Sequence, residues 1–174
     1  MNPKQILAAA FVLVPAMAFA QDKGPTDPQI AGIVVTANQI DVDAGKIAKA
    51  RSKNKEVQAF AQQMITDHTA VNKQAGALAK KLGVKPEDSD TSKSLKKAAA
   101  DAAKKLKALK GAQFDKAYVD NEVVYHQQVL DAIDKVLIPN ADNAELKGLI
   151  EKVRPAIAAH LEHAKHLQAS VGKK

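Results

Sequence analysis

The chain contains no cysteine and no tryptophan, and only 3% of its residues are aromatic. Without cysteine there can be no disulfide, no thiolate metal ligand, no cysteine nucleophile and no lipoprotein anchor. A core with few aromatic side chains must be built from Ala, Leu, Val and Ile, and a composition rich in Ala and Lys favours helices over sheets. The 174 residues, 46% of them hydrophobic, suit a single domain.

Motifs of the common enzyme classes are also missing. The sequence shows no Ser/His/Asp arrangement, no phosphate-binding loop and no paired-carboxylate cleft, and its Ser and Thr residues fall mostly in turns and at helix ends. There is therefore no candidate nucleophile for a hydrolase. We expect a protein that is not an enzyme.

The first 20 residues have the pattern of a secretory signal peptide. Lys4 gives a positive start, residues 6–19 form an apolar run, and the tripeptide Ala-Phe-Ala that ends at Ala20 is a typical cleavage site. A membrane anchor is the alternative, but the run is shorter than the ~20 residues that span a bilayer, and Pro15 interrupts it. We expect cleavage before Gln21, a periplasmic or secreted location, and no transmembrane segment in the mature chain.

The charge balance is basic. The formal net charge is +7, and it becomes +6 when the predicted signal peptide, which contains one lysine and no acidic residue, is removed. This charge suits anionic envelope surfaces, and an exported location makes nucleic acid an unexpected partner. The lysine-rich stretch from Lys93 to Lys110 can lie on such a surface. Alternatively, it is a solvated helix that covers the bundle.

Apolar residues recur at helical spacing over four long segments, residues 28–51, 55–82, 112–138 and 142–170. A shorter Ala/Lys-rich helix is predicted within residues 92–110, in the long connection between the second and third segments. The pattern predicts an all-α fold, a ferritin-like four-helix bundle with one long crossover that contains an extra helix.

The mature chain divides into two parts. Residues 21–35 are predicted to form a flexible lead-in and the start of the first helix, because Gly24, Pro25 and Pro28 lie close together there. Residues 36–170 are predicted to form the bundle domain.

Each predicted long helix carries one ionisable residue on its apolar stripe: Asp41, His68, His126 and His160. A buried polar group costs about 1–3 kcal/mol unless it finds a partner, so four such residues need an explanation. Counting residues from the helix ends predicts similar depths for Asp41, His68 and His126. The same count predicts that His160 lies about 10 Å lower, nearer to Glu122 than to His126.

Two interpretations of these residues remain open. The first is a site for a transition metal such as Zn, Cu, Fe or Ni, held by the three histidines with Asp41 or Glu122. The second is a buried hydrogen-bond network without metal, which fixes the register of the helices.

Two further residues are candidates to support such a site. Asp67 can orient a neighbouring histidine, or it can form a salt bridge with Lys or Arg at the rim of the bundle. His163 lies one turn beyond His160, on the edge of the same face. His166 lies off the stripe and is predicted to be solvated.

Three stretches carry a family resemblance: VQAFAQQMITDHTAVNKQ, LKGAQFDKAYVDNEVVYHQQVL and RPAIAAHLEHAKHL. They resemble the bacterial family called domain of unknown function 4142, whose members are often labelled predicted outer membrane or exported proteins. The resemblance covers residues 36–167 and implies a ferritin-like fold, an exported location and no established activity. The positions that match the family motif are Asp67, His68, Asn72, Phe114, Asp115, Tyr118, His126 and His160, and Asp41 stands where relatives usually have glutamate.

The sequence departs from ferritins in one important respect. Ferritin di-iron sites use Glu-x-x-His on two helices, whereas here Ile65 and Ile157 stand three residues before His68 and His160. The bridging carboxylates are missing, so ferroxidase chemistry is not expected. We therefore expect either an exported metal-binding protein with an envelope or stress-related role, or a structural protein of the cell envelope with a buried histidine network.

Overall fold

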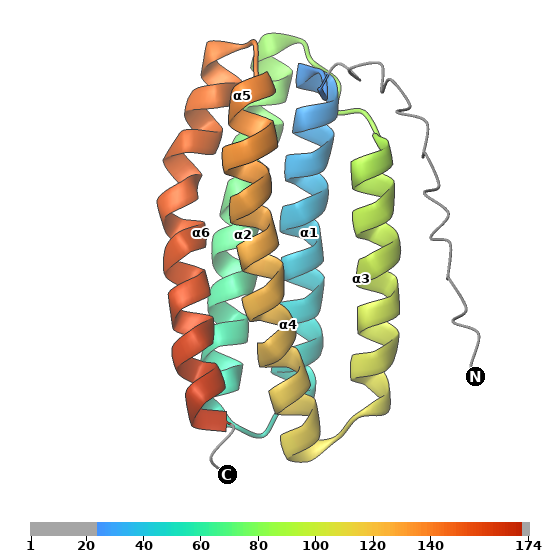
Figure 1. Ribbon diagram of the computed structural model, residues 1–174, viewed down its shortest axis with the longest axis vertical. Helices are drawn as coiled ribbons and strands as arrows, with labels where there is room; N and C mark the ends of the chain where they lie inside the picture. The colour runs from blue at the N-terminus through green and yellow to red at the C-terminus, as the bar shows by residue number, and fades with distance from the viewer. Residues whose placement is uncertain (1–23, 172–174) are drawn as a thin grey trace, which may run out of the picture.

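The computed structural model describes residues 24–171, and every regular element in this range is helical. The predicted all-α fold is confirmed. Figure 1 shows α1, α2, α4 and α6 side by side as a bundle, with α3 along one outer side. The predicted signal peptide, residues 1–20, lies outside the described residues. Within residues 24–171, no helix combines the length and the hydropathy that a membrane span requires.

Helices α1 (Asp27–Arg51) and α2 (Lys55–Leu82) form an antiparallel pair joined by a short turn. Asn54 caps α2, because its side chain accepts a hydrogen bond from the N–H of Glu56 at 2.9 Å. Gly83 ends α2 with a φ of 65°, a left-handed conformation that glycine adopts without penalty. The predicted bounds of this helix, residues 55–82, agree with the structure.

Helix α3 (Asp90–Ala108) carries the chain back along the outside of the bundle before α4 (Gly111–Ala132) begins. Because α3 returns the chain to the other end, α2 and α4 run in the same direction (Figure 1). It packs against α1 and α4, and only Ser92 and Leu106 on it are buried. This helix is the predicted crossover with its Ala/Lys-rich composition.

The end of α4 differs from the prediction of one regular helix over residues 112–138. The helix continues through one π-helical turn, η1 (Ile133–Leu137), into the short α5 (Ile138–Asn140). The π turn has a local cause, because Pro139 has no N–H to donate to the carbonyl of Lys135 and its ring crowds that carbonyl. The N–H at the start of α5 instead bonds the carbonyl five residues earlier, at the start of η1.

Helix α6 (Ala144–Val171) completes the bundle and pairs with α4. The side chain of Asn143 accepts hydrogen bonds from the N–H groups of Glu145 and Leu146, at 2.9 and 3.1 Å, so it caps this helix. The Asp27 carboxylate accepts the backbone N–H of Asn143 at 3.0 Å, which ties the start of α1 to the turn before α6.

Two apolar clusters fill the bundle, one toward each end. The Ile150 cluster consists of Ile30, Ile33, Val34, Ala75, Leu130, Ile133, Leu137, Ala141, Leu146, Ile150, Ile157 and Leu161. The Phe60 cluster consists of Ala48, Val57, Phe60, Ala61, Met64, Leu106, Phe114, Tyr118, Val119, Ala164, Leu167 and Val171. The ionisable residues of the core lie between the two: on α2, for example, His68 follows Met64 of one cluster and precedes Ala75 of the other.

A close approach of backbones explains one buried glycine of α1. A Cβ added at Gly32 would lie 1.9 Å from the carbonyl oxygen of Glu87, in the loop between α2 and α3. That loop is held there by a hydrogen bond from the N–H of Glu87 to the carbonyl of Pro28, at 2.9 Å. Any side chain at position 32 must therefore displace the loop.

This close approach gives a matched prediction. Gly32→Ala should destabilise the protein by about 1–3 kcal/mol, since the gain in helix propensity is smaller than the cost of the clash. Gly76→Ala lies in the interior of α2, and beyond the helix's own backbone no atom of the described residues is within 4 Å of the added Cβ, so it should stabilise by about 0.5–1 kcal/mol. Urea unfolding of the two variants measures both effects, and equal stability changes would refute the close approach at Gly32.

Candidate metal centre

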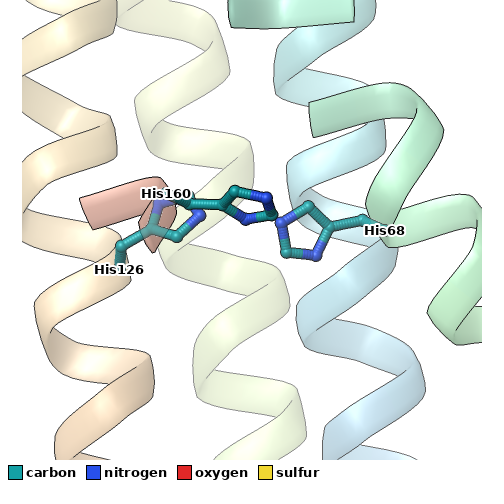
Figure 2. Close-up of side chains that lie close together, drawn as sticks. All are labelled: His68, His126 and His160. Carbon is teal, nitrogen blue, oxygen red and sulfur yellow. The ribbon is translucent and has the colours of Figure 1, made fainter. Parts of the chain in front are cut away.

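Five ionisable side chains meet at mid-height in the bundle: Asp41 from α1, His68 from α2, Glu122 and His126 from α4, and His160 from α6. Each is at most 3% exposed. Figure 2 shows the three imidazole rings, which point toward one another from three different helices. The structure thus brings together all the predicted ligands, and it also shows how their side chains are oriented.

The three histidines lie at one level. Their ring centroids are 5.7 Å apart for His68 and His126, 5.2 Å for His68 and His160, and 5.6 Å for His126 and His160. One ring nitrogen from each lies within 4.8 Å of the other two. These distances leave room for one ion between the rings.

The predicted displacement of His160 by about 10 Å is therefore wrong. The estimate depended on helix ends that were each misplaced by two residues: the α4–α5 rod ends at Asn140, and α6 begins at Ala144. With these ends His126 and His160 lie 14 and 16 residues from the same end of the bundle. The remaining difference of two residues corresponds to only about 3 Å.

His68 has one ring nitrogen occupied by a neighbour on α1. Its Nδ1 lies 2.7 Å from Oδ1 of Asn38. The amide of Asn38 is itself oriented, because its Nδ2 donates to the carbonyl of Val34 at 2.7 Å. Asn38 must therefore accept from His68, so the proton of this imidazole is on Nδ1 and its Nε2 carries a lone pair.

The other two histidines are held in the same way. Nδ1 of His126 donates to the backbone carbonyl of Glu122, one turn earlier, at 3.0 Å. Nε2 of His160 donates to the carboxylate of Asp67, at 2.9 Å. A histidine whose second nitrogen is fixed by a carboxylate or carbonyl is the usual arrangement around a protein-bound metal.

The inward nitrogens have no hydrogen-bond partner among the described residues. They are Nε2 of His68, Nε2 of His126 and Nδ1 of His160. Burial, reinforced by the neighbouring imidazoles, lowers the pKa of His68 to about 3, and burial lowers the pKa of His126 to about 4. Burial also lowers the pKa of His160, against the opposing effect of Asp67. All three rings are thus neutral at pH 7 and present lone pairs to one another.

Asp41 and Glu122 form a buried carboxyl pair beside these rings. One oxygen of each lies within 4.8 Å of the other and of a nitrogen of His126. Burial raises the pKa of Asp41, as does repulsion by Glu122, and burial raises the pKa of Glu122 to about 8. Oδ2 of Asp41 lies 3.4 Å from the inward Nε2 of His68, whereas Oε2 of Glu122 lies 3.5 Å from the outward Nδ1 of His126.

Two other predictions for this region need correction, and one open alternative is resolved. Glu122 neighbours His126 and Asp41 rather than His160, because the α4 backbone places it one turn from His126. Of the two alternatives for Asp67, the structure supports the first: its carboxylate pairs with His160 and orients that ring, rather than forming a rim salt bridge with Lys or Arg. His163 does not support the site, because it is exposed, pairs with Gln63 at 3.1 Å, and packs its ring edge-on against Phe60.

Asn38 is the residue that sequence reasoning missed. It is 7% exposed and lies one turn before Asp41, next to the apolar stripe of α1. Its spacing could have identified it, because residues three apart share a helix face and Asn38 is a polar residue three positions before Asp41.

The raised pKa of Glu122 gives a prediction for the metal-free protein. A folded-state pKa above the unfolded value of 4.5 contributes stability that is complete below pH 4.5 and is lost as pH rises toward 8. The unfolding free energy of the wild type, relative to Glu122→Gln, should therefore fall by about 1.4 kcal/mol per pH unit over this range. Both proteins share the histidine titration, which acts in the opposite direction and cancels in the comparison. Urea unfolding of both proteins at several pH values, with a chelator present, measures this change. If the difference between their unfolding free energies did not vary with pH, the raised pKa of Glu122 would be contradicted.

Comparison with known proteins gives one match. A family model described as a domain of unknown function (DUF4142) matches residues 13–167, most of the chain. No curated protein and no solved structure matches the chain, so the ferritin-like character of the bundle remains a prediction. The match includes all five ionisable residues of the site. The chain belongs to the DUF4142 family.

Proposed function

We propose that this protein binds one transition-metal ion through His68, His126, His160 and Asp41. One observation carries the proposal: each histidine is fixed through one ring nitrogen, while the other nitrogen is buried, has no partner within residues 24–171, and is directed at the same point. Three neutral imidazole nitrogens with a carboxylate are donors that suit Zn, Cu, Fe or Ni.

The roles of the two carboxyl groups differ. Asp41 lies beside the inward nitrogen of His68, which places it among the ligands. Glu122 lies on the outward side of His126, where it supports a ligand and supplies a second negative charge. When ionised, the two carboxylates together balance a divalent cation, so the buried site becomes neutral overall.

A hydrogen-bond network without metal fits less well. Such a network stabilises a core when its donors and acceptors are paired, and a half-satisfied network is worse than an apolar core. Here the three inward nitrogens are all acceptors, so they have no proton to share with one another, and the single carboxyl proton of Asp41 can serve at most one of them. A cation is the partner that satisfies all of them at once.

The proposed role is binding rather than catalysis of the di-iron type. Ile157 is buried in the apolar Ile150 cluster, and Ile65 packs close to the backbone of α1 at Gly45. Neither position offers the bridging carboxylate that a second iron would need. We propose that the protein holds its ion outside the cytoplasm, in the envelope, and this location is supported by the signal-like sequence of residues 1–20.

Metal content and affinity test the proposal directly. The protein, purified without a histidine tag and loaded with Zn, Cu, Fe or Ni, should retain about one ion per chain by mass spectrometry. His126→Ala should lower the affinity at least about 100-fold, because a ligand is lost, and Asn38→Ala by about 10–100-fold, because only the orientation of His68 is lost. His166→Ala is the matched control and should leave the affinity unchanged, since this histidine is exposed.

Two outcomes would overturn the proposal. The first is no retained ion with any of the four metals. The second is an ion that remains bound in His126→Ala and is lost in His166→Ala, which would place the site on the exposed C-terminal histidines. Circular dichroism of each variant shows whether the fold is kept.

A further inference from the structure

An apolar cavity of about 160 Å³ lies beside the metal centre, between α1, α4, η1 and α6. Most of its wall is aliphatic, and typical members are Ile33 and Val34 from α1, Val129 from α4 and Ile157 from α6. The cavity is a different space from the larger groove under α3, because among the described residues only Leu95, Tyr125 and Gln128 line both.

The two ends of the cavity differ in polarity. Its inner end is formed by Asn38, Asp41 and His68, all buried. There, Oδ1 of Asp41 and Nε2 of His68 have no hydrogen-bond partner among the described residues. Its outer end includes the exposed residues Thr91 and Val136, so it reaches the surface between the start of α3 and the π turn.

The cavity wall is built from two distinctive features of the fold. The π turn supplies Ile133, Val136 and Leu137, so the widened backbone caused by Pro139 lies along the cavity. Tyr125 supplies another wall, and its hydroxyl donates to the carbonyl of Ala37 at 3.0 Å, which fixes the ring. π turns within helices are frequent at functional sites.

We propose that this cavity binds a small uncharged molecule with an apolar body about the size of a benzene ring and one hydroxyl group. The volume of about 160 Å³ is close to the ~150 Å³ of an apolar cavity that holds benzene. A hydroxyl both donates and accepts, so it can pair with Asp41 and His68 at the inner end. A charged ligand would lose its hydration against the aliphatic wall without an opposite charge to replace it.

The occupancy of the cavity does not require the metal. Contact between the ligand hydroxyl and the bound ion, however, rests on the proposed metal-binding function. In the loaded protein the hydroxyl would approach the ion from the side of His68 and Asp41, which face both spaces. Measuring ligand binding with and without metal separates occupancy of the cavity from contact with the ion.

Phenol and toluene make a suitable pair of probes, because they have nearly the same size and differ in the hydroxyl. Phenol should bind the chelator-treated protein with a Kd of about 1 mM or below, in the range of ligands of seven heavy atoms. It should bind at least as tightly as toluene, although toluene gains more from leaving water. Saturation-transfer NMR and methyl chemical shifts of Leu137, Ile150 and Ile157 report binding and place the probe.

Matched variants locate the binding. Ala132→Leu, which fills the cavity, should weaken phenol binding at least tenfold while metal affinity stays within a few fold. Ala103→Leu, which lines only the groove under α3, should leave phenol binding unchanged. Thermal melts show whether each variant folds. If Ala132→Leu does not fold, the methyl shifts of the wild type still show whether phenol binds in the cavity.

Three results would overturn the inference: no phenol binding at 10 mM, toluene binding more tightly than phenol, or shifts confined to residues outside the cavity. Loss of metal binding with phenol binding retained would instead refute the metal centre and leave the cavity assignment standing. Metal binding without phenol binding would refute the cavity assignment alone.

Discussion

The structure depends on the burial of five ionisable groups in the middle of an otherwise apolar bundle. Desolvation keeps the histidines neutral and drives the carboxyl groups toward their protonated forms, so the layer carries little net charge when no cation is bound. The two apolar clusters on either side exclude water and hold the four long helices together. With no disulfide available, this packing has to maintain the layer unaided.

Helix direction and helix register bring the layer together. The crossover through α3 makes α2 and α4 run the same way, so His68 and His126, at similar distances from their helix starts, meet at one level. Antiparallel pairing of α1 with α2 and of α4 with α6 then brings Asp41 and His160 to the same height. The outward nitrogens are fixed by a side-chain amide, a backbone carbonyl and a carboxylate, so each ring is oriented by a hydrogen bond to a different kind of acceptor.

Much of this arrangement was predictable from the sequence, and the rest failed for identifiable physical reasons. The 3-and-4 spacing of apolar residues predicted the helices. The single ionisable residue on each apolar stripe identified the core residues Asp41, His68, His126 and His160. The depth of His160 was wrong because an error of two residues at each of two helix ends adds up along the axis. The π turn before Pro139 and the role of Asn38 depend on backbone adjustment and side-chain rotamers, which periodicity does not encode.

The most direct test of the central claim is the tautomer of each core histidine in the metal-free protein at pH 7. Two-dimensional NMR of ¹⁵N-labelled histidine distinguishes protonation at Nδ1 from protonation at Nε2. The hydrogen bonds predict neutral rings with the proton on Nδ1 for His68 and His126 and on Nε2 for His160, and metal should shift the unprotonated nitrogen of each. Imidazolium signals for these residues, or the opposite tautomers, would contradict three lone pairs converging on one point.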